Sequence, residues 1–216
     1  GALTLTWVLL IACFARDWAA MFDQWWNIST YTHVLLVPPI IGWLVWQRWP
    51  ELRDMVPTGW RPGLWLFAGA AIGWVLGAFS GFNLARQAAA VAMLGASALT
   101  ILGPKVGRGL AFPLAYMAFL VPFGDELVPP LQLITAELTI LLTRASAIPA
   151  LIDGVFIDTP AGLFEVAEAC SGVKFLIAMI AFGVLAANVC FVSWKRRIAF
   201  FALSLVAPFH PNGVLT

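Results

Sequence analysis

The stretch GLWLFAGAAIGWVLGAFSG, residues 63–81, decides the class of this protein, because it is long enough to cross a membrane and holds no charged side chain. The whole chain of 216 residues is 62% hydrophobic and 11% charged, with a mean hydropathy of +0.91, whereas soluble domains are about 25% charged. Further apolar runs bounded by charges or turn residues lie at about 1–15, 34–47, 87–103, 109–122, 131–149, 172–192 and 198–208. These runs predict one all-α polytopic membrane domain over residues 1–216, with about seven transmembrane helices.

Glycine recurs at every fourth position from 69 to 81. Small residues at this spacing allow the backbones of two membrane helices to come close together. The repeat therefore predicts tight packing of this helix within the bundle, and a seam between two copies of the chain is the alternative. Its members are Gly69, Gly73, Gly77 and Gly81.

Basic residues concentrate in three connections between the apolar runs. Short cytoplasmic loops collect Lys and Arg, so we expect these three connections to be cytoplasmic. Residues 16–33, 122–130 and 150–171 are then expected to be external. Trp25 and Tyr31, together with Trp26, then suit an external aromatic belt. Eight of the twelve basic residues form the three connections: Arg48, Arg53, Arg61, Lys105, Arg108, Lys195, Arg196 and Arg197.

Residues 131–149 conflict with this orientation if they cross the membrane once, because both flanking segments would be external. The run carries polar residues such as Gln132 and Glu137, so it reads as one interfacial or re-entrant helix that starts near Pro129. The alternative is that one basic connection is misassigned and the run spans. Further on, residues 155–158 and 163–168 flank the turn-rich TPAG and predict a small external β-hairpin.

EVAEACSGVKFLIAM, residues 165–179, places polar residues directly before an apolar helix. We expect this helix to begin at about Ser171, so that its free N–H groups and partial positive charge, with Lys174 one turn on, favour a thiolate at Cys170. Glu165 and Glu168 oppose this by repelling a nearby anion. The alternative is that Cys170 is a small apolar filler at a helix start.

The other two cysteines, Cys13 and Cys190, lie inside apolar runs where packing explains them. Three cysteines also form no paired framework. Cys170 is therefore the candidate reactive thiol of the chain.

Three stretches resemble one known family. FEVAEACSGVKFLIAM, residues 164–179, closely resembles the signature of the exosortases, and of the exosortase A branch in particular. STYTHVLLVPPIIGWLVWQRWPEL, residues 29–52, resembles an early span of that family, and FPLAYMAFLVPFGDELVPPLQLITAELT, residues 112–139, resembles its central external loop. The resemblance runs from about Asp17 to Pro208.

The resemblance implies an activity. Exosortases are bacterial inner-membrane cysteine proteases of transpeptidase type, which cut the C-terminal PEP-CTERM sorting signals of exported proteins, often alongside exopolysaccharide production. It implies that Cys170 is the nucleophile at the periplasmic face, with Glu168 and Ser171 of the same motif as supporting residues. Lys174 stands where many relatives have Arg. His33 corresponds to a frequent family histidine, although an interfacial polar residue is the alternative.

The end of the chain departs from the family pattern. Relatives continue from a VAP-like segment into a motif with a catalytic arginine and then a span with a histidine, whereas this chain reads VAPFHPNGVLT over residues 206–216. Asn212 and Gly213 keep the register, so Leu215 occupies the arginine position, and His210 matches nothing in the pattern. We therefore expect that both ends are clipped, that the C-terminal catalytic spans are missing, and that the chain cleaves its substrate poorly.

Other function classes receive less support from the sequence. There is no HExxH, paired CxxC or glycine-rich phosphate loop, so we expect no metal and no cofactor. A net charge of +1 gives no reason to expect nucleic acid, which leaves the sorting signal and membrane lipid as partners. The alternatives are a transporter or channel subunit with a polar path lined by Glu137, Arg86 and Arg144, or a non-catalytic sorting or assembly factor.

Overall fold

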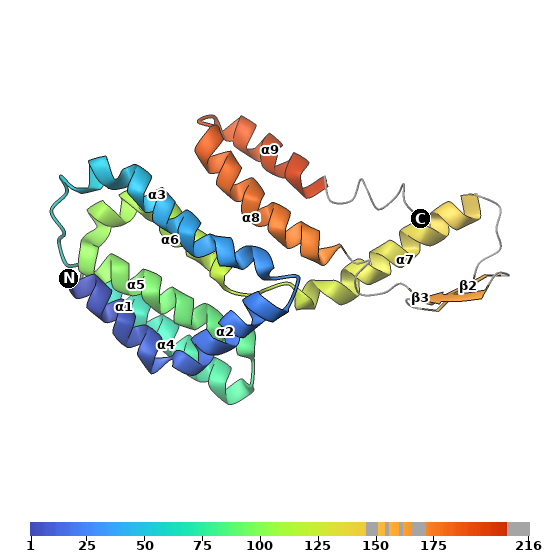
Figure 1. Ribbon diagram of the computed structural model, residues 1–216, viewed down its shortest axis with the longest axis horizontal. Helices are drawn as coiled ribbons and strands as arrows, with labels where there is room; N and C mark the ends of the chain where they lie inside the picture. Colours follow the sequence, from blue (N-terminus) through green and yellow to red (C-terminus); the bar gives the residue numbers. More distant parts are fainter. Residues whose placement is uncertain (146–150, 154–155, 160–161, 166–171, 207–216) are drawn as a thin grey trace. The chain divides into compact units, whose positions relative to one another are not determined.

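The computed structural model describes residues 1–145, 151–153, 156–159, 162–165 and 172–206 (Figure 1). The chain forms two compact units, Gly1–Pro122 and Phe123–Thr216. The first unit is entirely helical. Its α-helices and 3₁₀ helices are α1 (Ala2–Cys13), α2 (Ala15–Asn27), η1 (Thr32–Leu36), α3 (Val37–Leu52), α4 (Gly63–Ser80), α5 (Asn83–Gly109), α6 (Ala111–Tyr116) and η2 (Met117–Leu120).

Helix α5 lies at the centre of the first unit, and α4 packs antiparallel along one side of it (Figure 1). A Cβ atom on Gly77 would lie 2.9 Å from the backbone nitrogen of Arg86 at one end of the pair, and one on Gly63 would lie 2.9 Å from Thr100 Cα at the other end. Gly77 therefore confirms the predicted close packing, whereas Gly69 has open space around it. Gly81 has a different use, because it ends α4 with a left-handed φ of 70°.

Helix α5 breaks at Gly103, which adopts φ 81° and ψ 172° directly before Pro104. The chain that connects α3 to α4 lies against this break, since Trp60 N donates to Thr100 O at 2.8 Å. Beyond the break, Val106 and Leu110 pack with Leu52 of α3 in a small hydrophobic cluster. The last turn of α5, which carries Lys105 and Arg108, is thus fixed to the end of α3.

Residues 15–27, which the sequence placed in an external connection, form helix α2, bent by 83° from α1. The prediction of an interfacial belt is wrong for Trp25 and Tyr31, because both are buried, with 7% and 1% exposure. Trp25 Nε1 donates to Leu120 O at 3.1 Å, which satisfies the indole inside the protein. Trp26, the next residue along α2, is 65% exposed.

The second unit contains helices and a small sheet, and its strands are antiparallel in the order β1-β2-β3. Thr159 at the end of β2 pairs with Gly162 at the start of β3. The hairpin expected at 155–158 and 163–168 falls on β2 and β3, although residues 155 and 166–168 lie outside the described part. Strand β1 was not predicted. The elements are η3 (Asp125–Leu127), α7 (Val128–Ala145), β1 (Leu151–Asp153), β2 (Phe156–Thr159), β3 (Gly162–Glu165), α8 (Val173–Cys190) and α9 (Trp194–Val206).

Three helices in the described part of the chain are long and apolar enough to cross a membrane: α4, α5 and α8. The number rises to five if α1 with α2, and α6–η2 with η3–α7, each count as one broken span. Helices α3 and α9 have 16 and 13 residues, which at about 1.5 Å per residue is short of a hydrocarbon core of about 30 Å. About seven spans stays a prediction, and so does the interfacial or re-entrant placement of α7.

Candidate functional site

Three of the predicted site residues, Cys170, Glu168 and Ser171, lie outside the described residues. The described part of the site begins at Gly172, which is buried and has a left-handed φ of 69° at the N-terminus of α8. A residue with a side chain rarely adopts this conformation. The glycine of the CSG motif is therefore where the backbone turns into α8, two residues after Cys170.

The first turns of α8 have one buried and one exposed side. Val173 and Ile177 are 3% and 2% exposed, whereas Lys174 is exposed. The backbone nitrogens of a first helical turn have no partner within the helix and carry partial positive charge. Lys174 adds a full positive charge at the same place, and both charges would favour an anion at this helix start.

Gly124 fixes the loop before α7 against the same helix start. It has φ 134°, and a Cβ atom on it would collide with Ile177 Cδ1 and lie 3.3 Å from Val173 Cγ1. The PFGDELVPP loop and the start of α8 therefore meet within the second unit. This contact joins two of the stretches on which the family resemblance rests. It also brings the exposed carboxylates of Asp125 and Glu126 to this end of α8.

His33 lies in η1 of the first unit and is half-buried. Its Nδ1 is 3.0 Å from Thr30 O, so with the proton on Nδ1 the ring donates to this carbonyl and Nε2 is left as an acceptor. Burial lowers the pKa of His33 from its ordinary value, and the hydrogen bond to Thr30 acts in the opposite direction. The imidazole is thus neutral at pH 7 and able to accept a proton.

An ion pair in the first unit was missed by the sequence analysis. Arg86 Nη2 lies 2.6 Å from Asp17 Oδ1, and Trp74 Nε1 donates to Asp17 Oδ2 at 2.9 Å. The guanidinium carbon of Arg86 also lies 5.7 Å from the centre of the Trp74 ring. The Asp17 side chain is only 8% exposed and that of Arg86 28%, so the charges are mostly removed from solvent.

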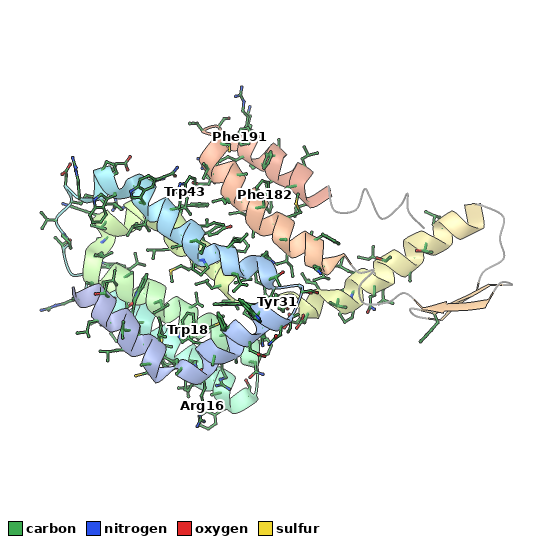
Figure 2. All side chains as sticks on the ribbon, viewed as in Figure 1. Arg16, Trp18, Tyr31, Trp43, Phe182 and Phe191 are labelled. Atoms are coloured by element: carbon green, nitrogen blue, oxygen red, sulfur yellow. The ribbon has the colours of Figure 1, made fainter. Side chains whose placement is uncertain are left out.

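This cluster corrects the interpretation of Arg86, which reaches inward to a carboxylate on α2 rather than along a polar path. The neighbour of Asp17 behaves differently: Figure 2 shows Arg16 pointing away from the helices of this unit, whereas Tyr31 lies among them. Adjacent charged residues at a helix start look alike in a sequence. The signal that distinguishes them is the alignment of Asp17, Met21 and Trp25 four residues apart on one buried side of α2.

Glu137, which the sequence placed on a possible polar path with Arg86, is exposed on α7. The side chain of Arg144 lies outside the described part. In that part, no group of three or more His, Cys, Asp and Glu side chains is arranged to hold a metal ion.

The helices and the start of α8 define a multi-pass helical membrane protein with a polar motif at one helix N-terminus. The family model described as transmembrane exosortase matches residues 25–214. The chain therefore belongs to the transmembrane exosortase family, which confirms the resemblance at the level of the family, whereas the exosortase A branch stays a prediction. No curated protein and no solved structure matches the chain. Exosortases in general are membrane cysteine transpeptidases that act on sorting signals.

Proposed function

We propose that this protein is a membrane-embedded cysteine protease or transpeptidase that cleaves C-terminal PEP-CTERM-type sorting signals of exported proteins. It acts in the bacterial inner membrane with Cys170 at the periplasmic face, in systems linked to surface sorting and exopolysaccharide production. The observation that carries the proposal is the start of α8, where Gly172 and Lys174 follow Cys170 and Gly124 fixes the neighbouring loop. The family match over residues 25–214 supports the same conclusion.

The reaction follows from the chemistry of a thiolate at this position. The sulfur of Cys170 attacks the carbonyl carbon of the scissile peptide bond, the C–N bond breaks, and the leaving amine takes up a proton. The acyl group is then held as a thioester. Attack by water or by another amine releases it and regenerates the thiol, so the products are a hydrolysed or a transferred protein.

The polar groups that follow Cys170 would favour the charged forms along this path. Positive charge from the start of α8 and from Lys174 stabilises the thiolate before attack. Glu168 and Ser171 of the same motif are proposed as supporting residues. The resemblance places Leu215 at the position of the family's arginine, so Leu215 is proposed not to serve as an oxyanion donor, and loss of such a donor typically lowers turnover by about 10² to 10³.

His33 is proposed as the group that exchanges the proton with the leaving amine. Its neutral imidazole with a free Nε2 can accept the thiol proton of Cys170 at pH 7, and the imidazolium that forms can then give this proton to the leaving amine. The alternative is that His33 serves only to cap the turn at Thr30. A His33→Asn variant keeps a polar side chain for the turn but cannot exchange protons, so it separates the two roles.

The test is co-expression of the chain with an exported reporter that ends in a PEP-CTERM signal. We expect slow processing that is lost in Cys170→Ala and retained when Cys13 and Cys190 are replaced by serine. Leu215→Arg should raise the rate if the missing arginine limits turnover. Processing that survives Cys170→Ala would refute the proposal.

Cys170→Ala and the alkylation rates of the three cysteines distinguish the two alternative functions. A non-catalytic sorting factor would bind the signal equally well with and without Cys170 and would cleave it in neither case. A transporter gives no reason for Cys170 to react faster with an alkylating reagent than Cys13 or Cys190. The buried pairing of Arg86 with Asp17 supports the exosortase interpretation, because it removes one of the charges that a polar path would need.

A further inference from the structure

One end of the first unit gathers two segments that are far apart in the sequence, residues 48–61 and residues 103–109. Trp60 N donates to Thr100 O at 2.8 Å, and Arg48 Nη1 lies 3.4 Å from Gly109 O. The first contact holds the α3–α4 connection against α5 just before its break, and the second holds α3 against the end of α5 (Figure 1). We call the surface formed by 48–61 and 103–109 the basic end.

The basic end has a net positive charge. Only two acidic side chains, Glu51 and Asp54, accompany its five basic ones, which gives a net charge of +3. Among the described residues, four of these five basic side chains form no ion pair with a carboxylate. The fifth, Arg53, pairs with Asp54 at 3.6 Å, and both of these side chains are highly exposed. The basic residues are Arg48, Arg53, Arg61, Lys105 and Arg108, and all are exposed.

An apolar pocket lies on α3 beside this charge. It has a volume of about 260 Å³ and is lined by Trp46, Gln47, Trp49 and Pro50. Trp46 and Trp49 are 71% and 58% exposed, so their indole rings form an open apolar surface. Arg53 follows Trp49 and Pro50 by one helical turn and therefore lies on the same side of the helix.

We propose that the basic end is a binding site for an anionic phospholipid of the bilayer. The pocket at Trp46 and Trp49 takes the glycerol and the first methylene groups of the acyl chains, and Arg53 lies next to the phosphate. The remaining basic residues supply the positive field that selects an anionic headgroup over a zwitterionic one. The proposal is independent of the peptidase activity.

Position along the helices favours a lipid over a soluble anion. Helix α5 runs from Asn83 to its break at Gly103, a length of about 30 Å at 1.5 Å per residue, which matches the hydrocarbon core. The basic end is therefore at the depth of the headgroups, where exposed tryptophans are concentrated in membrane proteins. A soluble phosphate would use the charges but would gain nothing from the apolar pocket.

The test is lipid titration of the purified full chain in detergent, with bound lipids counted by native mass spectrometry. We expect phosphatidylglycerol to bind more tightly than phosphatidylcholine. Lys105→Gln with Arg108→Gln should weaken phosphatidylglycerol binding by about 25-fold, at roughly fivefold for each charge removed, and should leave phosphatidylcholine unchanged. Trp46→Ala with Trp49→Ala should weaken both lipids.

The matched controls are Arg16→Gln and Trp26→Ala, which remove an exposed arginine and an exposed tryptophan from α2. These variants should bind both lipids like the parent chain. Equal binding of the two lipids by the parent, or an equal loss in the controls, would overturn the proposal. Displacement of phosphatidylglycerol by millimolar inorganic phosphate would assign the site to a soluble anion instead, and a dimer that hides the basic end would assign it to a second copy of the chain.

Discussion

Replacing Gly124 with alanine tests whether the PFGDELVPP loop holds the start of α8 in place. Gly124 has φ 134°, and an added Cβ atom would collide with Ile177 Cδ1 and lie 3.2 Å from Ile177 Cγ1. Two separate costs therefore fall on Gly124→Ala. The first is backbone strain, and the second is overpacking against a side chain that is only 2% exposed.

A matched control separates the two costs. A residue with a side chain in a sparsely populated backbone region costs about 1 to 3 kcal/mol, and overpacking of a well-packed site costs a further ~1 to 3 kcal/mol. Gly162→Ala is the matched control, because Gly162 has a similar φ of 141° and open space at its Cβ position. We expect Gly124→Ala to be less stable than Gly162→Ala by about 1 to 3 kcal/mol, the overpacking part alone.

Two measurements are made on the full chain in mixed micelles. The first is the unfolding midpoint, and the second is the alkylation rate of Cys170 in a background where Cys13 and Cys190 are serine. Gly124→Ala should lower the unfolding midpoint and change the alkylation rate of Cys170 before global unfolding. Ile177→Val removes the colliding Cδ1 atom and should partly restore the midpoint of the double variant, although alone it costs about 0.5 to 1.5 kcal/mol. Equal midpoints for Gly124→Ala and Gly162→Ala would refute the reasoning.

Three further predictions concern single groups. Asp17→Asn leaves Arg86 without its counter-charge and should lower the free energy of unfolding by about 3 kcal/mol. This is the lower end of the range for a buried pair, because Arg86 is partly exposed. Asp23→Asn, at an exposed carboxylate of the same helix, should leave the free energy of unfolding almost unchanged in the same assay. Cys170 should be alkylated faster than the other two thiols at every pH below about 8.5, the ordinary value for a free thiol, and an equal rate for all three would contradict this. Since the pKa of His33 is lowered, the contribution of His33 to stability is complete above about pH 6.5 and is lost as the pH falls from 6.5 toward the folded pKa. His33→Asn should flatten the pH dependence of the unfolding midpoint in this window. An unchanged profile would show that the ring does not titrate differently on folding.

Much of the fold could be predicted because membrane helices are set by local composition. Residues 63–81 and 172–192 became α4 and α8 with ends shifted by only one or two residues. The break within residues 83–109 was also partly visible, since Gly103 and Pro104 stand next to each other. Local composition does not report which aromatic side chains are buried, and this is why Trp25 and Tyr31 were assigned to the membrane interface.

The candidate site could be predicted in part, for a related reason. A helix start at about Ser171 and a cation at Lys174 follow from the order of residues along the chain, and α8 begins two residues later, at Val173. The contact of Gly124 with Ile177 joins positions more than 50 residues apart, and no local pattern specifies such a partner. Only the packing around Gly124 shows that this position excludes a side chain.

The pairing of Asp17 with Arg86 bears most directly on the choice between the proposed peptidase and a transporter. A charge that lines a path must exchange its partner for an ion or water, and a carboxylate bound by both a guanidinium at 2.6 Å and an indole N–H at 2.9 Å is already fully engaged. Gly77 adds a second constraint, because α4 packs closely against the backbone of Arg86 at this position. A separation of α4 from α5 would lose these contacts. The buried charge of the first unit therefore stabilises a fixed arrangement of α2, α4 and α5, as expected for the scaffold of a peptidase and not for a moving gate.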